Sequence, residues 1–200
     1  MELNAQLAAQ LQIPLRQVQA AVELIDGGNT IPFIARYRKE ATGGLDDTQL
    51  RELLEKLTYL RSLQQRKEEV LALVEGQGAL TEEWKNQVLQ AQTLAEVEDL
   101  YRPYRPKRKT RASVAKEKGL EPLAQRILEQ NPQDPEPLQL AQDYCGTEQV
   151  PTAQEALQGA MDILAESVSD DAGVRKMLRG YLLSQGMLQT KAATQEDSVY

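Results

Sequence analysis

Hydrophobic positions along this chain recur at the three- and four-residue spacing of amphipathic helices. The clearest run lies between residues 47 and 75, where leucines and valines fall on one stripe. At 1.5 Å per residue, an uninterrupted helix there would be about 40 Å long. A rod of that length is typical of a spine between domains or of one half of a long helical hairpin. The stripe consists of Leu50, Leu53, Leu54, Leu57, Leu60, Leu63, Val70, Leu71 and Val74.

Shorter stretches with the same spacing predict further helices, bounded by glycine, proline and capping residues. No run of alternating β-branched residues is long enough to predict a strand. We therefore expect an all-α fold with many helices and a long central one. The shorter predicted helices cover residues 2–12, 14–26, 32–38, 81–91, 94–101, 112–118, 121–130, 138–144, 153–169 and 171–185.

The first two predicted helices meet within residues 7–18 in a pattern like a helix-turn-helix. The second of them offers Arg16 as its one cation, so two packed helices without DNA contact are the competing interpretation. Residues 42–45 (Thr-Gly-Gly-Leu) predict a turn between helices, with a phosphate cradle as the less favoured interpretation.

Residues 131–137 contain three prolines and predict a linker. On this basis residues 1–130 form one helical domain, and residues 138–200 form a second helical subdomain that is part of a longer protein. Residues 190–200 carry no apolar periodicity, and we interpret them as a frayed end or as the point where a longer chain was cut.

Composition excludes several kinds of chemistry. The chain has no histidine and a single cysteine, so a structural zinc site and a Ser-His-Asp or Cys-His centre are excluded. Phosphate-binding loops of the GxxxxGK[ST] and GxGxxG kinds are absent. We expect no enzyme activity, no metal and no cofactor. The acidic pairs Asp46-Asp47 and Asp170-Asp171 are interpreted as helix N-terminal residues, and Trp84 as a core anchor.

The chain has no stretch of 18 apolar residues, and its first residues lack the basic start and apolar core of a secretory signal. The lone Cys145 allows no internal disulfide. These features predict a cytoplasmic protein without a membrane partner.

Charge is distributed very unevenly along the chain. Residues 101–118, here called the basic segment, contain eight Lys or Arg and one Glu. Residues 1–100 contain ten basic and sixteen acidic residues, and residues 119–200 contain five and thirteen. A basic stretch between acidic arms is attracted to polyanions such as nucleic-acid phosphates or an acidic protein surface.

Four arginines of the basic segment fall three residues apart, and guanidinium groups bind phosphate bidentately. Two tyrosines could stack on unpaired bases, and Pro103 and Pro106 favour an extended backbone. The competing interpretations are charge neutralisation within the fold, with the tyrosines packed as core, and a docking site for a protein. The candidate nucleic-acid-binding residues are Tyr101, Arg102, Tyr104, Arg105, Lys107, Arg108, Lys109, Arg111, Lys116 and Lys118.

A second, smaller basic cluster follows the aromatic residues of the helix predicted over 32–38. It consists of Arg36, Arg38 and Lys39.

Two long segments and two shorter ones closely resemble the bacterial Tex family of transcription accessory proteins. The similarity runs in order over most of residues 1–190 and is weakest in 131–151. The segments are residues 28–45 (GNTIPFIARYRKEATGGL), 98–112 (EDLYRPYRPKRKTRA), 118–123 (KGLEPL) and 159–166 (GAMDILAE).

The resemblance implies the helical N-terminal region of an elongated, multidomain, nucleic-acid-binding protein involved in transcription. In this family an RNase-H-like domain, helix-hairpin-helix elements and an S1 domain follow, and much of the binding is credited to the S1 domain. Two functions remain open: non-specific binding of RNA or DNA phosphates through the basic segment, or a helical scaffold that positions other domains or contacts the transcription machinery. The choice between RNA and DNA, the protein partner and the oligomeric state are open as well.

Overall fold

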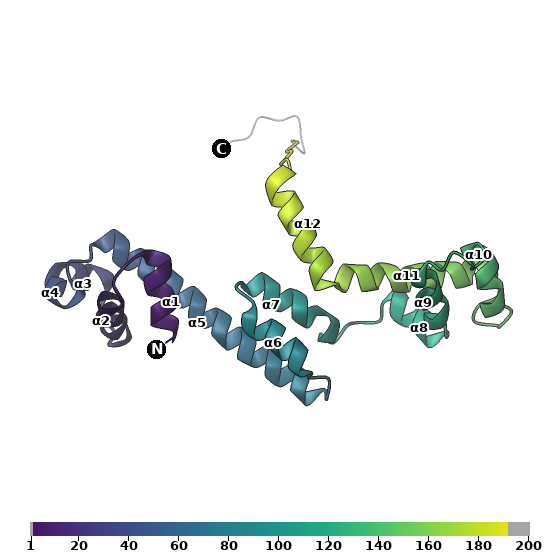
Figure 1. Ribbon diagram of the computed structural model, residues 1–200, viewed down its shortest axis with the longest axis horizontal. Coiled ribbons are helices and arrows are strands. Elements are labelled where there is room, and N and C mark those ends of the chain that lie inside the picture. Colours follow the sequence, from purple (N-terminus) through teal and green to yellow (C-terminus); the bar gives the residue numbers. More distant parts are fainter. Residues whose placement is uncertain (1, 192–200) are drawn as a thin grey trace. The chain divides into compact units, whose positions relative to one another are not determined.

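The computed structural model describes residues 2–191, and within that range all regular elements are helical (Figure 1). The all-α prediction is confirmed. The chain divides into two compact units, Met1–Leu94 and Ala95–Tyr200. Most of the predicted terminal stretch without periodicity, residues 192–200, lies outside the described residues.

The first unit begins with the predicted helix-turn-helix-like pair. The turn between the first two helices uses Gln12 at φ 55°, and the two helices pack against each other. The helices of this unit are α1 (Glu2–Leu11), α2 (Leu15–Asp26), α3 (Ile31–Tyr37), α4 (Lys39–Thr42), α5 (Asp47–Gly76) and α6 (Glu82–Gln90).

The long helix α5 organises the first unit. Asp46 and Gln49 form a reciprocal capping box at its start, which satisfies backbone N–H groups that the helix itself leaves unpaired. Helices α1, α2 and α3 pack against α5, and so does α6 (Figure 1). Its buried stripe is Leu50, Leu53, Leu57, Leu60, Leu63, Lys67, Val70 and Val74.

The buried stripe of α5 includes one charged side chain. Lys67 is 8% exposed, and its Nζ donates a 2.7 Å hydrogen bond to the Leu89 carbonyl at the end of α6. A buried ammonium is tolerated when its donors are satisfied, and this one ties α6 to α5. Trp84 is buried on α6, as predicted.

A short helix that the sequence analysis did not predict, α4, precedes the predicted turn at residues 42–45. The turn itself is confirmed. Gly43 and Gly44 have φ values of 65° and 90°, in the region that favours glycine. Gln17 on α2 donates a 3.2 Å hydrogen bond to the Gly43 carbonyl, which holds the turn beside α2.

The second unit is arranged around α11. Helix α7 starts at the last residue of the first unit. The helical elements are α7 (Leu94–Tyr101), η1 (Arg102–Tyr104), α8 (Arg111–Glu117), α9 (Glu121–Glu129), α10 (Pro137–Leu140), η2 (Ala141–Tyr144), α11 (Ala153–Asp170) and α12 (Ala172–Gln185).

Helices α8, α9 and α10 and the turn η2 all pack on α11 (Figure 1). The core between them is rich in alanine, so the backbones approach closely. Leu123 and Leu140 belong to the same core, although they lie on opposite sides of residues 131–137. The predicted linker therefore lies within one compact unit, and the division between units falls after Leu94.

The last described helix, α12, begins with Asp171 as its N-cap, whose Oδ1 accepts a 2.7 Å hydrogen bond from the Val174 N–H. The preceding Asp170 is the last residue of α11, so only one member of this acidic pair plays the predicted N-terminal role. None of the α12 side chains is buried.

Gly159 on α11 faces α8 closely. A Cβ at this position would overlap Leu120 Cδ1 and lie 3.2 Å from Ala115 Cβ, and both of those residues are buried. Gly180 on α12 provides a matched control, because a Cβ there would meet nothing within 4 Å.

We expect Gly159→Val to lower the free energy of unfolding by about 1–3 kcal/mol through overpacking. Gly180→Val should change it by less than about 0.5 kcal/mol, because valine and glycine differ little in helix propensity. Urea unfolding followed by circular dichroism measures both. Equal effects of the two variants would contradict the close α8–α11 contact.

Candidate nucleic-acid interface

The backbone of the basic segment is extended only in its central part. Tyr101 ends α7, which matches the helix predicted over 94–101, but residues 102–104 form the 3₁₀ turn η1, so the extended backbone predicted around Pro103 is wrong there. Pro103 falls within the first turn of that short helix, where its missing N–H costs no hydrogen bond. Residues 106–110 carry no regular structure, and Thr110 then caps α8.

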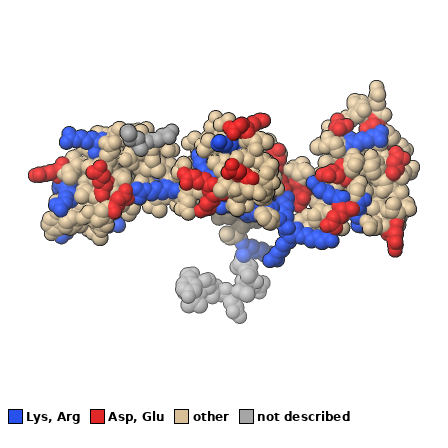
Figure 2. Space-filling view, turned by 90° about the horizontal axis from the view of Figure 1, so that it is seen from below, with Lys and Arg blue, Asp and Glu red and all other residues tan. Residues whose placement is uncertain are grey.

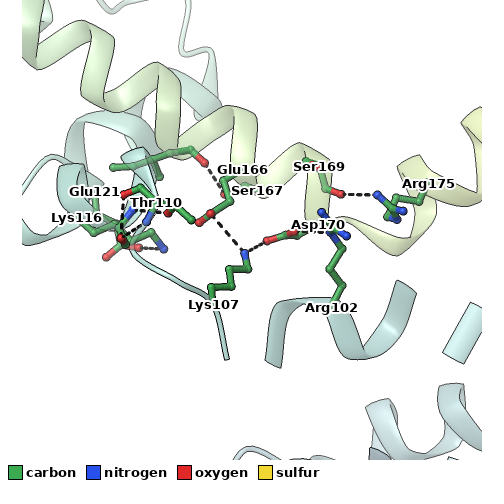
Figure 3. Close-up of polar contacts among 12 residues, drawn as sticks. Arg102, Lys107, Thr110, Lys116, Glu121, Glu166, Ser167, Ser169, Asp170 and Arg175 are labelled. Carbon is green, nitrogen blue, oxygen red and sulfur yellow. Dashed lines mark hydrogen bonds and ion pairs between the residues drawn. The ribbon is translucent and has the colours of Figure 1, made fainter. Parts of the chain in front are cut away.

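Three cations of the basic segment pair with one row of carboxylates on α11. Asp162, Glu166 and Asp170 lie four residues apart and thus on one helical face. We call these three residues the acidic row. Arg102 Nε lies 2.9 Å from an Asp170 oxygen, and Lys107 contacts both Asp170 and Glu166 (Figure 3). Arg111 approaches Asp162 at 3.8 Å. The segment therefore runs antiparallel to α11, from Asp170 back to Asp162.

The members of the acidic row are more covered than their partners. The Asp170 side chain is 13% exposed, whereas the side chains of Arg102 and Lys107 are 43% and 33% exposed. Because both cations reach the same shielded carboxylate, they attach η1 and the extended stretch to the end of α11. The Arg111 side chain is 86% exposed and its contact with Asp162 is long, so among these three cations Arg111 is held most weakly.

Three further cations form local pairs on the surface. Arg105 lies 2.5 Å from Glu98, Lys109 lies 3.1 Å from Glu117, and Lys116 lies 2.9 Å from Glu121. All six side chains are at least 38% exposed. Exposed pairs of this kind contribute about 0–1 kcal/mol, so a competing anion can replace the carboxylate.

Arg108 and Lys118 form no ion pair with any residue of the described range 2–191. Both side chains are exposed. The basic segment therefore contains two groups of cations. One group, Arg102 and Lys107, is held by the shielded Asp170, and the other is free or weakly paired and consists of Arg105, Arg108, Lys109, Arg111, Lys116 and Lys118.

Neither of the two tyrosines that were predicted to stack on bases has a fully exposed ring. Tyr101 is 5% exposed, and the Arg105 guanidinium lies 5.7 Å from its ring centre. Tyr104 is half-buried. Tyr101 therefore follows the alternative interpretation, packing in the interior, because α7 turns its side chain inward.

Two of the hollows that flank the basic segment lie beside its least firmly held cations. A pocket of about 420 Å³ is lined by Lys109, Arg111 and Lys118 together with Glu155 and Asp162. A second, of about 360 Å³, is lined by Arg102, Arg105, Lys107 and Arg108 together with Glu166 and Asp170. Both combine cations with carboxylates, so an anion would enter them by displacing a side-chain partner rather than by filling a purely basic cavity.

Basic and acidic side chains are interleaved over the face seen in Figure 2, and one larger gathering of blue atoms is bordered by red.

The described residues contain no group of His, Cys, Asp or Glu suited to hold a metal ion. None of the helices in residues 2–191 combines the length and the apolar character needed to cross a bilayer.

The second basic cluster lies in the first unit, at the end of α3 and the start of α4. Arg36, Arg38 and Lys39 form no ion pair with any described residue. The Arg38 guanidinium lies 5.3 Å from the ring centre of Phe33.

A polar cluster that the sequence analysis missed attaches α12 to α7. Arg175 and Arg179 each donate a 2.6 Å hydrogen bond to the buried Asp99, and Lys176 lies 2.9 Å from Glu96. Burial raises the pKa of the Asp99 carboxyl, but the two guanidinium hydrogen bonds outweigh that effect and hold its pKa below the ordinary value.

The spacing of two arginines in the sequence indicated one half of this polar cluster. Arg175 and Arg179 lie four residues apart and so share a face of the predicted helix. Nothing in the sequence names Asp99 as the carboxylate that they meet, since it lies 76 residues before Arg175.

Two family models match the chain. Residues 1–75 match the Tex-like protein N-terminal domain, and residues 132–199 match the Tex central region-like model. The second match starts within the predicted linker, although the structure places that linker inside one compact unit.

Relatives with substantial identity cover most of the chain. The transcriptional accessory protein Tex of Neisseria gonorrhoeae is 47% identical over 191 residues, which is 96% of this chain and 25% of that protein. The protein tex of Bordetella pertussis is 48% identical over 190 residues, which is 94% of this chain and 24% of that protein. The human S1 RNA-binding domain-containing protein 1 is 30% identical over 159 residues, which is 79% of this chain and 16% of that protein. The chain thus spans about a quarter of the length of the bacterial relatives.

We expect Asp99→Asn to lower the free energy of unfolding at pH 7 by about 1–3 kcal/mol, because charge-assisted hydrogen bonds are replaced by weaker ones. A carboxyl whose pKa is lowered by folding contributes stability that is present above its unfolded pKa of about 3.9 and is lost as the pH falls through its folded pKa. The difference between variant and parent should therefore shrink below about pH 4. Urea unfolding over a pH series measures it.

Glu52→Gln serves as the control, because Glu52 forms an exposed pair with Lys56 at the helical i, i+4 spacing. Its effect should stay below about 0.5 kcal/mol at every pH. A pH-independent loss in the Asp99 variant would contradict the role of its charge.

Proposed function

Because the chain belongs to the Tex family, we propose that it is the N-terminal module of a cytoplasmic, Tex-like transcription accessory protein and binds RNA or DNA phosphates without sequence specificity. The contacts come from the part of the basic segment that the fold leaves available. Arg108 and Lys118 carry the proposal, since both are exposed and form no ion pair within residues 2–191.

The neighbouring Lys109 and Arg111 add to these two. Their side chains are 68% and 86% exposed, and Arg111 approaches its carboxylate only at 3.8 Å. Phosphate oxygens can replace such weakly held partners, because a guanidinium or ammonium forms charge-assisted hydrogen bonds with phosphate. Arg102 and Lys107 have a different role in this proposal, namely holding the segment on α11.

Non-specific binding fits this group of contacts. Phosphate contacts position a protein on nucleic acid without reading bases. The buried Tyr101 and half-buried Tyr104 offer little base stacking beside them. The name of the human relative refers to RNA binding by an S1 domain, and that relative is matched over 16% of its length. This name supports a nucleic-acid context for the proposed function.

A second candidate function, a docking scaffold, is favoured by α12. Met177, Leu178, Tyr181 and Leu182 share one face of this helix and are 50–65% exposed. Arg175, Lys176 and Arg179 on the adjoining face hold the helix through the ion pairs to Asp99 and Glu96 described above. We propose that the apolar face packs against the polypeptide that lies outside the matched quarter of the longer relatives.

The phosphate-binding function predicts a salt dependence. About four phosphate contacts give a slope of about −3 to −4 for log K against log salt concentration. In the Arg108→Ala/Arg111→Ala/Lys118→Ala variant the slope should fall to about −1, with weaker binding to all sequences alike. Fluorescence anisotropy with labelled single-stranded RNA and duplex DNA over a salt series measures it.

A charge-matched control is Arg51→Ala/Lys56→Ala/Lys85→Ala, which removes three exposed cations from α5 and α6. It should leave the slope unchanged. Equal losses in the two triple variants would mean that net charge alone, and not the basic segment, determines binding. No binding by the parent chain at about 50 mM salt would refute the function for this module.

The docking function predicts a substitution effect that depends on context. In the 200-residue chain, Leu182→Glu should change the free energy of unfolding by less than about 0.5 kcal/mol, because Leu182 is 62% exposed. In a chimera that continues into the remaining sequence of a Tex relative, the same change should cost about 2 kcal/mol or more, by placing a charge in an apolar contact. Hydrogen exchange of the α12 amides measures the change in protection.

Gln185→Glu is the control on the same helix, and it should be silent in both contexts. No effect of Leu182→Glu in the chimera would contradict the docking role. A concentration-dependent dimer of the 200-residue chain that Leu182→Glu abolishes would assign the apolar face to a second copy instead.

A further inference from the structure

A group of aromatic and basic side chains on α3 and the start of α4 is left without a role by the proposed function. Phe33 is the chain's one phenylalanine, yet it is 36% exposed, and Tyr37 is 61% exposed. Their ring centres lie 5.4 Å apart with planes inclined by 46°. Two adjacent rings at the surface are unusual in a chain whose aromatic content is 4%.

The geometry of α3 explains why both rings face outward. Ile31 and Ile34 are buried and occupy the face that packs against α5. Phe33 and Tyr37 are four residues apart, so they share another face of the helix. The core of the first unit is complete without the rings, because Ile31 and Ile34 already fill the contact.

Cations surround the two rings. The Arg38 guanidinium lies 5.3 Å from the Phe33 ring centre, and one of its nitrogens lies 3.5 Å from the Tyr37 carbonyl. Arg36, Arg38 and Lys39 form no ion pair with any described residue, and Glu40 is the one acidic residue within residues 27–45. This contrasts with the basic segment, where most cations have acidic partners.

Exposed rings beside unpaired cations match the chemistry of a strand of unpaired nucleotides. Each base offers a flat π-face that stacks on an aromatic ring, and each linkage offers an anionic phosphate for a guanidinium or ammonium. Bases within a duplex are already stacked on one another, so a site of this kind favours single strands. A ring already in contact with Arg38 can receive a base once the guanidinium turns to a phosphate.

We propose that the Phe33–Tyr37 face of α3 is a second binding site, which stacks unpaired bases of single-stranded nucleic acid on its two rings. Arg36, Arg38 and Lys39 bind the adjoining phosphates. This site lies in the first unit and is independent of the basic segment in the second. Binding at this second site requires bases as well as phosphates, whereas binding by the basic segment requires phosphates alone.

The test uses the 200-residue chain and two labelled strands of about 12 nucleotides, a length within the usual range of single-strand site sizes. One is oligothymidine, and the other has the same backbone with abasic positions throughout. In Phe33→Leu/Tyr37→Leu we expect the affinity for oligothymidine to fall by about tenfold or more. The affinity for the abasic strand should stay unchanged, because the cations remain.

Leucine keeps apolar bulk at both positions, and thermal unfolding checks that the variant folds like the parent. Tyr37→Leu alone, at the more exposed position, is the reserve variant and should show the same selective loss. The Arg108→Ala/Arg111→Ala/Lys118→Ala variant should weaken both strands equally if the basic segment binds phosphate. The two sites can therefore succeed or fail separately.

Three results would overturn the second site. One is binding of oligothymidine by the double variant as tightly as by the parent, which would assign the exposed rings to a protein contact. The double variant could lose both strands in equal proportion, which would mean that the rings only support the cations. The parent chain could also prefer the abasic strand or duplex DNA over oligothymidine.

Discussion

The arrangement of the second unit depends on matching one row of carboxylates on α11 with the cations that precede α8. The acidic row repeats every four residues along the helix, and the basic segment runs antiparallel to it. Figure 3 shows one end of this match, where Arg102 and Lys107 reach Asp170. Seven net positive charges within residues 101–118 repel one another. Pairing three of these cations with α11 relieves that repulsion and attaches the irregular stretch 106–110 to a rigid helix.

This match divides one basic stretch into two kinds of side chain. Arg102 and Lys107 share the shielded Asp170 and have a structural role. Arg108 and Lys118, in contrast, remain available. The net charge of −7 over the whole chain is compatible with phosphate binding by these side chains. Salt screens the repulsion between a phosphate and distant carboxylates, whereas contacts at a few angstroms are screened much less.

Charge rather than apolar contact also holds α12. Its arginines meet the buried Asp99, and none of its side chains is buried. An apolar face turned outward on a helix attached by ion pairs is the opposite of the usual amphipathic arrangement. The rings on α3 are likewise turned outward, because the isoleucines of this helix already fill its contact with α5. Both surfaces are features of individual helices, and each is consistent with a module that works within a longer protein.

Helix positions followed from local patterns in the sequence. The stripe from Leu50 to Val74 predicted α5, and the acidic pair Asp46-Asp47 marked its start. These signals are short-range, since a helix buries one face at 3.6-residue spacing whatever its partner. The short elements α4 and η1, which were not predicted, span four and three residues and are too short to carry such a pattern.

The partners of the charged and aromatic side chains required the tertiary structure. The sequence identified the basic segment and the second basic cluster, but it left open whether the cations meet phosphates or carboxylates. Arg102 meets an acid 68 residues away, and Arg179 meets one 80 residues away. The same dependence on packing buried Tyr101 and placed residues 131–137 inside one unit. Local spacing thus determined which helices form and which faces are charged, whereas only the fold decided which charges are neutralised, because ion pairing depends on contacts between residues distant in the chain.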